Sequence, residues 1–274
     1  MKFLFCGDIV GKSGREAITK HVPQLKKDLK LDFVIANGEN AAHGFGINAK
    51  IAKELYEVGV DVITTGNHVW DQPSIYTEIS QDKNMIRPIN YPPAAKHPGN
   101  GTVVVENASG HKLLVINVMG QLFMEAMDNP FHAIDAALKN YTLGSNIQGI
   151  LIDIHAEATS EKAAMGHYVD GRATLVVGTH THVPTADHQI LKGGTAYMTD
   201  AGMCGDYSYS VVGMDPETPI KRFTKTARKD KLSPAEGEGT LCGVYVESDN
   251  KTGKATKICP IRIGGSLDQI TTIK

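Results

Sequence analysis

Residues 32–68 read DFVIANGENAAHGFGINAKIAKELYEVGVDVITTGNH, and this stretch decides the fold class. Its apolar beginning and its apolar end each predict a buried strand. Between them, Asn48 can cap an amphipathic helix whose apolar residues recur every three or four positions. A strand, a helix and a strand in succession indicate a βαβ unit, and therefore parallel strand pairing.

The same alternation extends in both directions from this unit. Residues 2–6 predict a strand and residues 15–30 an amphipathic helix, which Pro23 can kink or split. Later strands are expected within residues 101–120, 149–157, 173–182 and 194–200, helices over 131–139 and 159–168, and a hairpin over 239–263. Parallel units early and hairpins late predict an α/β fold of two packed sheets with helices outside, in one domain over residues 1–274.

Composition narrows the class of protein. The chain has 274 residues with 30 acidic and 28 basic side chains, a balance that gives no support for a long nucleic-acid partner. No apolar run reaches the roughly 20 residues of a membrane span, and Asp8 interrupts what a signal peptide would need. The four cysteines are far apart and lack a CxxC motif. We expect a cytoplasmic protein with no membrane partner; a homo-oligomer stays open.

Polar residues follow five of the predicted strands at the point where each strand ends. Ligands of open α/β sheets bind beyond the carboxyl ends of the strands, so these side chains can converge although they lie far apart in sequence. Each is weak evidence alone, and the prediction rests on their recurrence in one topological position. The candidates are Asp8, Glu39, Asn40, Asn67, His68, His155, His180 and His182.

The residue types favour a metal centre. Carboxylate, amide and imidazole groups without a thiolate suit Fe, Mn or Zn, and they are too many for one tetrahedral ion. If the segment stays extended, the spacing of two in His180-Thr181-His182 puts both imidazoles on one face. Two ions about 3.5–4 Å apart, bridged by a carboxylate, would use the whole set. The positive charge of two divalent ions exceeds the negative charge of Asp8 and Glu39, so the site favours a hydroxide and a phosphate anion. The sequence therefore predicts a site for phosphoester hydrolysis.

A family resemblance rests on these same motifs. GDIVG (7–11), NGEN (37–40), GNHVWD (66–71), His155 and GTHTHVP (178–184) occur in order. Together they resemble the calcineurin-like metallophosphoesterases, and more closely the YmdB-type branch, described as 2′,3′-cyclic-nucleotide 2′-phosphodiesterases. The resemblance implies a two-sheet sandwich flanked by helices, with four layers in the order α/β/β/α, and a hydrolase activity on small phosphodiesters.

The resemblance also implies roles for single residues. Two divalent or mixed-valence ions, first of all Fe with Mn or Zn as alternatives, would bind at this site. A metal-bridging hydroxide would open the 2′ ester of a 2′,3′-cyclic nucleotide to give the 3′-nucleotide, and His68 would protonate the leaving oxygen as general acid. One ion would be held by Asp8, Glu39, Asn40 and His182, and the second by Asn67, His155 and His180, with Glu39 bridging the pair.

Three positions depart from the broad superfamily pattern. Val10 stands where the common first motif has a histidine ligand, and Glu39 where the bridging residue is commonly an aspartate. Both differences belong to the YmdB-type branch. Val69 replaces the acidic residue that often follows the catalytic histidine. Asp71 can orient His68 in its place, or it can be a plain surface or cap residue.

Two alternatives remain open at this point. A non-catalytic regulator that depends on metal or nucleotide could keep every ligand on the same scaffold. A nuclease acting on RNA or DNA would need a basic surface, because phosphate contacts come mostly from Lys and Arg. Residues 221–231 are locally basic, but we interpret them as a solvated helix end and loop.

Overall fold

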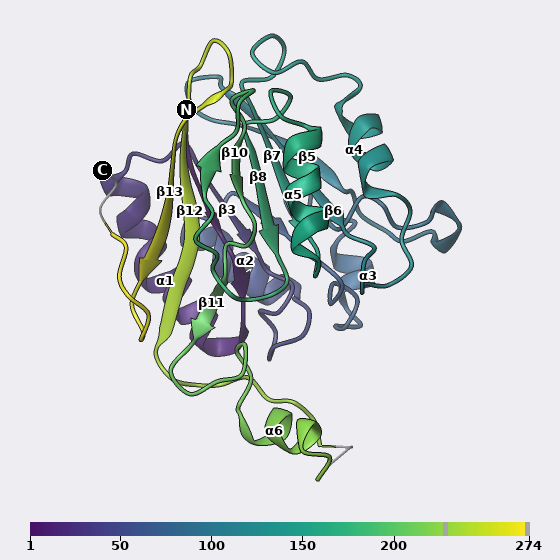
Figure 1. Cartoon of the computed structure of the whole chain (residues 1–274), viewed down its shortest axis with the longest axis vertical. Helices are drawn as coiled ribbons and strands as arrows, with labels where there is room; N and C mark the ends of the chain where they lie inside the picture. The colour runs from purple at the N-terminus through teal and green to yellow at the C-terminus, as the bar shows by residue number, and fades with distance from the viewer. Residues whose placement is uncertain (227–229, 272–274) are drawn as a thin grey trace.

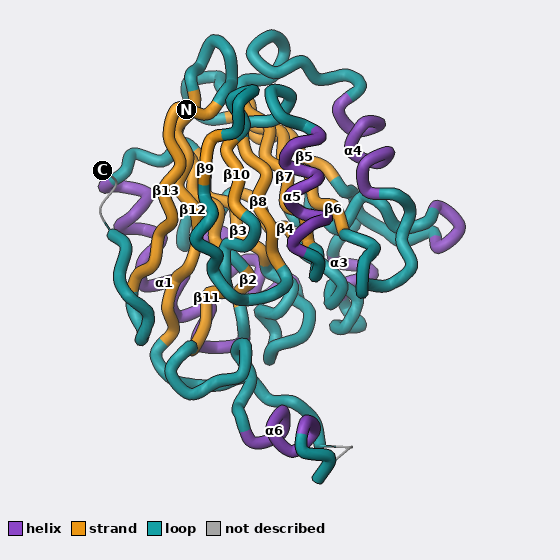
Figure 2. The backbone as a smooth tube through the Cα atoms, viewed as in Figure 1, coloured by secondary structure: helices purple, strands orange, loops and turns teal. Residues whose placement is uncertain are grey.

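Two β-sheets lie face to face with helices on their outer sides (Figure 1). The structure is a computed structural model, and it describes residues 1–226 and 230–271. The predicted four-layer α/β/β/α sandwich is confirmed. Figure 2 shows the strands of both sheets lying roughly along one axis through the middle of the molecule.

The first sheet has the strand order β2-β11-β12-β1-β3-β4, with β13 paired to β12. The pairs β1–β3 and β3–β4 are parallel, as the βαβ pattern predicts, and β12–β13 is the expected antiparallel hairpin. Its strands are β1 (Lys2–Cys6), β2 (Asp8–Ile9), β3 (Phe33–Asn37), β4 (Val62–Thr64), β11 (Met203–Asp206), β12 (Gly239–Ser248) and β13 (Ala255–Ile263).

The second sheet has the strand order β5-β6-β7-β8-β10-β9. Strands β6, β7, β8 and β10 are parallel to one another, whereas β5 and β9 are antiparallel edge strands. Its strands are β5 (Thr102–Glu106), β6 (Lys112–Met119), β7 (Gly149–His155), β8 (Leu175–Thr179), β9 (Gln189–Ile190) and β10 (Ala196–Met198).

Strand β1 shows why the layers form. Its side chains alternate between the two faces of the sheet: Leu4 and Cys6 pack in the outer cluster, whereas Phe3 and Phe5 pack between the two sheets. Apolar residues of both sheets share this inner cluster. The outer layers are α1 (Gly11–Asp28) and α2 (Ala49–Glu57) on the first sheet, and α4 (Pro130–Leu138) and α5 (Thr159–Tyr168) on the second.

The helices that the sequence predicts are present, but some of them begin or end at other residues than expected. Helix α1 begins at Gly11 rather than residue 15, and it continues through Pro23 as one helix. The Asn48 cap is confirmed, because its side chain accepts a hydrogen bond from Ile51 N at 3.0 Å. Short helices that the sequence did not predict are α3 (Ile75–Glu78) and the 3-10 helix η1 (Pro93–Ala95), whereas α6 (Glu217–Phe223) ends within the basic segment where a helix end was expected.

Residues 207–226 and 230–236 belong to an arm that leaves the body beyond the carboxyl ends of the parallel strands and carries α6 (Figure 1). Backbone bridges Val211–Met214 and Met214–Pro234 close its base. Of the basic segment 221–231, Arg228 and Lys229 lie outside the described residues. Across residues 1–226 and 230–271, we find no helix with the length and apolar character of a membrane span. The single domain over residues 1–274 stays a prediction.

Candidate metal centre

The carboxyl ends of β1, β3, β4, β7 and β8 meet at one end of the sandwich, toward the arm in Figure 1. Because these strands are parallel within each sheet, the polar residues that follow them arrive at the same edge. The carboxylates of Asp8 and Glu39 and the imidazole of His155 are almost completely buried there. Buried charged groups of this kind need a partner or a bound ion.

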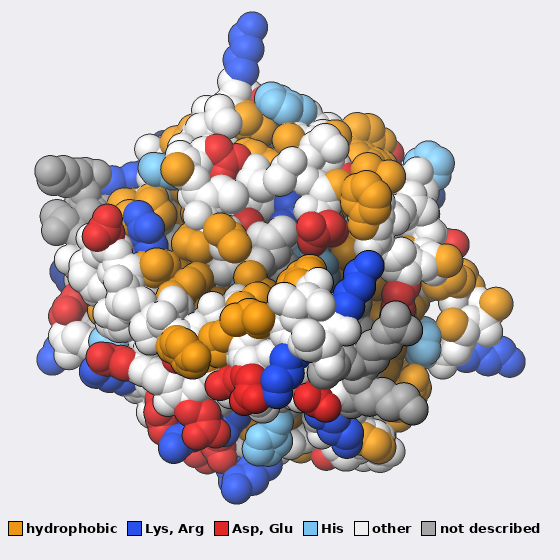
Figure 3. Space-filling model, turned by 60° about the horizontal axis from the view of Figure 1, so that its bottom comes forward, with side chains coloured by type: hydrophobic (Ala, Val, Ile, Leu, Met, Phe, Trp, Pro, Cys, Tyr) orange, Lys and Arg blue, Asp and Glu red, His pale blue; other side chains and the backbone are white. Residues whose placement is uncertain are grey.

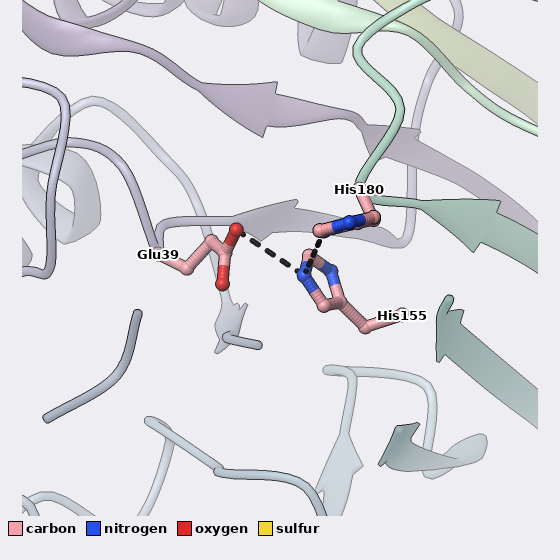
Figure 4. Close-up of side chains that lie close together, drawn as sticks. All are labelled: Glu39, His155 and His180. Atoms are coloured by element: carbon pink, nitrogen blue, oxygen red, sulfur yellow. Dashed lines mark hydrogen bonds and ion pairs between the residues drawn. The ribbon is translucent and has the colours of Figure 1, made fainter. Parts of the chain in front are cut away.

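The first group of side chains converges on His155 Nε2. Glu39 Oε1 lies 3.2 Å from this nitrogen, Asn67 Oδ1 lies 2.8 Å away, and His180 Nδ1 lies 3.1 Å away. Figure 4 shows Glu39 and both imidazoles pointing toward one another. Two imidazole nitrogens and two oxygens that face a common point offer lone pairs that a divalent cation can share.

The second group converges on the other side of Glu39. Asp8 Oδ1 lies 3.9 Å from His182 Nε2, and the Asn40 amide lies 3.1 Å from both Glu39 Oε1 and His182 Nε2. Among the described residues, Asp8 Oδ1 and Asn40 Oδ1 are buried acceptors without a hydrogen-bond partner. Turning over the Asn40 amide would aim its oxygen at the same point. Orphaned buried oxygens fit a metal.

Glu39 belongs to both groups. The ligand atoms of Glu39, His155 and His180 all lie within 4.8 Å of one another, and so do those of Asp8, Glu39 and His182. Two sets of three residues that share one carboxylate match a pair of ions with a bridging ligand.

The electrostatics describe a tightly coupled acid–base cluster. Burial raises the pKa of Asp8 to about 6, although the nearby His182 and His155 oppose this shift. Burial would also raise the pKa of Glu39, but the charge and hydrogen bond of His155 outweigh it and leave this pKa well below its usual range. Burial lowers the pKa of His155, and the Glu39 carboxylate overcomes this and raises it to about 9. Burial and then the charge of His155 lower the pKa of His180 to about 3.

Each of the three imidazoles has one nitrogen in the site and the other held from outside. Such outer contacts fix the tautomer and the ring orientation of a metal-ligating histidine. The contacts are His155 Nδ1 with Thr179 Oγ1 at 2.9 Å, His180 Nε2 with Glu157 Oε2 at 3.4 Å, and His182 Nδ1 with the Val212 carbonyl at 2.8 Å.

The backbone after β8 corrects one expectation. The strand ends at Thr179, and His180 and His182 have φ angles of 97° and 65°, so the segment is not extended. The two imidazoles converge on Glu39 through a left-handed turn, not through strand alternation. Backbone in this region is unfavourable for residues other than glycine, and such strain is typical of functional sites.

A buried polar network lies beneath the ligands and joins the two sheets. The carboxylate of Asp153 accepts hydrogen bonds from Thr64 Oγ1 at 2.6 Å, Thr179 Oγ1 at 2.7 Å and Asn37 Nδ2 at 3.1 Å. Burial raises the pKa of Asp153 to about 7. Since Thr179 also contacts His155, the network connects this imidazole to a carboxylate in the core.

A second network holds the left-handed turn. Lys162 Nζ and Asp200 Oδ2 form a completely buried ion pair at 2.8 Å. The same carboxylate oxygen accepts hydrogen bonds from the Thr181 hydroxyl at 2.8 Å and the Thr181 backbone N–H at 3.2 Å. Thr181 lies between His180 and His182, so this pair fixes the segment that presents both imidazoles.

His68 lies at the rim of the centre, with 31% of its side chain exposed. Its backbone N–H donates to Glu39 Oε2 at 3.1 Å, and its Nδ1 lies 2.7 Å from Asp71 Oδ2. Phe45 contacts the imidazole edge-on, with ring centroids 5.1 Å apart. The Asp71 contact leaves His68 Nε2 free to face a substrate.

The structure therefore brings together all eight residues that the sequence singled out. Sequence reasoning did not find their outer partners Thr179, Asp153, Glu157 and Val212. Glu157 follows His155 by two positions, which is a weak signal. The outer contact of His182 Nδ1 is the backbone carbonyl of Val212. A backbone group leaves no signal in the types of residue.

Comparisons with known proteins support the resemblance. A model of the YmdB-like protein family matches residues 4–261. The 2′,3′-cyclic-nucleotide 2′-phosphodiesterase of Bacillus subtilis is 48% identical over 258 residues, which cover 94% of this chain and 95% of that protein. A putative phosphatase/phosphodiesterase of Mycoplasma pneumoniae is 38% identical and covers 96% of this chain and 93% of its own length.

Solved structures agree in fold. A hypothetical protein from Thermus thermophilus superposes with a TM-score of 0.89 at 39% identity, covering 97% of this chain and 100% of that one. A novel phosphatase from Mycoplasma pneumoniae has the same TM-score at 36% identity, covering 96% and 93%. The likeness in sequence extends over nearly the whole chain, and the matched residues 4–261 span every motif of the centre. The chain belongs to the YmdB-like protein family.

Proposed function

We propose that this chain is a metal-dependent phosphodiesterase that opens the 2′ ester of 2′,3′-cyclic nucleotides and releases 3′-nucleotides. The observation that carries the proposal is the pair of ligand groups that share Glu39. The activity for which the Bacillus subtilis relative is named, at 48% identity over most of both chains, supports the choice of substrate.

The residues present fit two metal ions. Asp8, Glu39, Asn40 and His182 would hold one ion, and Asn67, His155 and His180 the other, with Glu39 shared. Mixed oxygen and imidazole ligands suit iron, our first choice, with manganese and zinc as alternatives. When bound, such ions acidify water and neutralise charge on phosphoryl oxygens.

His68 is the proposed proton donor. Its Nδ1 is engaged by Asp71, so Nε2 is the nitrogen that can give a proton to the 2′ oxygen as the ester opens. Asp71 keeps the imidazole in this tautomer and orientation. The bond from the His68 backbone N–H to Glu39 ties the donor to the metal centre.

We also propose a cytoplasmic location. Cys6, Cys204 and Cys242 are buried thiols outside any disulfide, which agrees with a reducing compartment. The question of a homo-oligomer stays open.

The test uses protein purified without chelator and loaded with Fe(II) under anaerobic conditions, with Mn(II) or with Zn(II). We expect hydrolysis of 2′,3′-cyclic AMP to 3′-AMP, identified by chromatography against both isomers. Formation of 2′-AMP would contradict the assigned bond. No hydrolysis with any of the three metals would contradict the enzyme and favour a regulator, and fragmentation of linear RNA would favour a nuclease.

A further inference from the structure

Phe123 is an exposed aromatic residue with an unusual backbone. Its side chain is 90% exposed, and its φ of 63° lies in the left-handed region, which is rare for a residue other than glycine. Leu122 beside it is half exposed. A large apolar side chain held out into solvent at a backbone cost suggests a contact made with a ligand.

The loop that presents Phe123 is firmly anchored. The buried carboxylate of Glu161 accepts hydrogen bonds from the backbone N–H groups of Gln121 at 2.9 Å and Leu122 at 3.3 Å. The Gln121 side chain donates to the Met127 carbonyl at 2.6 Å and closes the loop on itself. The ring of Phe123 is therefore displayed by fixed backbone on both its flanks.

This loop starts beside the metal centre. Met119 pairs with His155 in the β6–β7 register, and the Gly120 N–H donates to the His155 carbonyl at 3.0 Å. Two residues beyond His155, Glu157 contacts His180. Three residues of chain reach at most about 11 Å, so Phe123 stays within that distance of Gly120.

The strand that leads to Phe123 ends beside the strand that leads to His68. Met119 and Met127, which flank the loop, belong to the apolar cluster against which Trp70 packs, two residues after His68. The Thr65 N–H, near the end of β4, also donates to Asn117 of β6 at 3.3 Å. The side of His182 is bounded instead by the arm.

The chemistry of the substrate connects these two residues. In a 2′,3′-cyclic nucleotide the leaving 2′ oxygen stays attached to the ribose, so the sugar and its base lie on the side of the proton donor. We propose that Phe123 is the platform on which the base of the cyclic nucleotide stacks. This inference rests on the proposed function and extends it to the residue that selects nucleotides among small cyclic phosphodiesters.

Two other exposed aromatic residues at this end of the molecule serve as matched controls. Tyr209 is 71% exposed and lies three residues from Val212, and Phe223 is 84% exposed in α6. Both lie on the arm, on the His182 side of the centre. Figure 3 shows hydrophobic side chains gathered across the middle of this face of the molecule.

The experiment compares two five-membered cyclic diesters, 2′,3′-cyclic AMP and the base-free glycerol 1,2-cyclic phosphate. We expect Phe123→Ala to lower kcat/KM for cyclic AMP about 10-fold, mainly through KM, because a stacked base loses its partner. Glycerol cyclic phosphate should be hydrolysed as before. Phe123→Trp should retain the activity on cyclic AMP, and Tyr209→Ala and Phe223→Ala should keep the wild-type ratio between the two diesters.

Three results would overturn the inference. These are an equal loss on both diesters, no loss on either, or a loss selective for cyclic AMP in Tyr209→Ala or Phe223→Ala in place of Phe123→Ala. Hydrolysis of neither diester by the metal-loaded wild type is a separate failure, since it removes the proposed function as well. Because Phe123 is so exposed, its substitution should leave the midpoint of thermal unfolding unchanged.

Discussion

Asn67 and His68 are neighbours in sequence, yet they belong to regions of opposite character. Asn67 faces a cluster in which Asp8, Glu39 and His155 are almost completely buried. His68 lies at the rim, where 31% of its side chain is exposed, and Asp71 is the one residue hydrogen-bonded to its imidazole among the described residues. The contrast separates the proposed metal centre from the residue that we propose as proton donor.

The buried region is held in several independent ways. The outer nitrogen of each imidazole has a partner, the Asp153 network supports the ligands from below, and the Lys162–Asp200 ion pair fixes the left-handed turn. The His68 imidazole is held only by the Asp71 carboxylate and an edge contact from Phe45 among the described residues. Changes in the buried region should therefore alter metal content, and changes at the rim should alter turnover alone.

The largest effect is expected from Glu39→Gln. This change removes the carboxylate that both ligand groups share and keeps its size. Bound metal, measured by elemental analysis, should fall close to zero, and hydrolysis should fall to the level of the metal-free protein. A variant that keeps two ions per chain would show that the shared ligand is dispensable. It would contradict the assignment of the buried region as the part that determines metal content.

His68→Ala should show the opposite pattern. Loss of a general acid lowers turnover by roughly 10²–10⁴-fold, while the metal content should stay near that of the wild type. Turnover and metal content measured on the same preparation provide the check. If turnover survives, another group is the proton donor and the division between the two regions does not hold.

The buried region is also the part that sequence predicts best. Asp8, Glu39 and His155 lie at or within two residues of the ends of apolar strands, and the βαβ rule alone brings such ends to one edge of a sheet. The two packed sheets follow from strands that are apolar on both faces, such as β1. These features depend on local patterns, so a single sequence carries them.

The remaining features depend on contacts between distant segments. The partner of His155 is Thr179, 24 residues away, and the partner of His182 is the Val212 carbonyl, 30 residues away. The left-handed φ angles of His180 and His182 have no sequence signal, since glycine is the usual residue there. Spacing alone leaves two roles open for Asp71, because it does not show where the side chain points.

A pair of threonines sharpens the picture of the buried region. Thr179 and Thr64 both donate to Asp153, but only Thr179 also contacts His155. Thr179→Val should weaken metal affinity about 10–100-fold, because the imidazole loses its outer partner. Thr64→Val should leave metal affinity near that of the wild type. Both variants lose one hydrogen bond to Asp153, so their thermal stability should fall by a similar amount. Equal metal affinity in the two variants, measured by competition with a chelator, would show that the Thr179 contact is only structural.

The smallest expected effect concerns Asp71, which we assign as the positioning residue for His68. Asp71→Asn keeps the size of the side chain but removes the charge that orients the imidazole. We expect turnover of 2′,3′-cyclic AMP to fall about 10-fold with KM and metal content unchanged, since His68 itself remains. Asp71→Glu, which restores a carboxylate on a longer side chain, should recover part of the loss.

The leaving group distinguishes this role from a merely structural one. The 2′ alkoxide of a cyclic nucleotide needs a proton as the ester opens, whereas p-nitrophenolate is stable as an anion and leaves without one. Asp71→Asn should therefore slow cyclic AMP much more than bis-p-nitrophenyl phosphate, and His68→Ala should show the same selectivity to a greater degree. If Asp71→Asn slows both substrates equally, then Asp71 only supports the loop after β4. The orientation of His68 would then depend on the packing of this loop and not on the Asp71 carboxylate. The rim and the buried centre would differ only in how exposed they are.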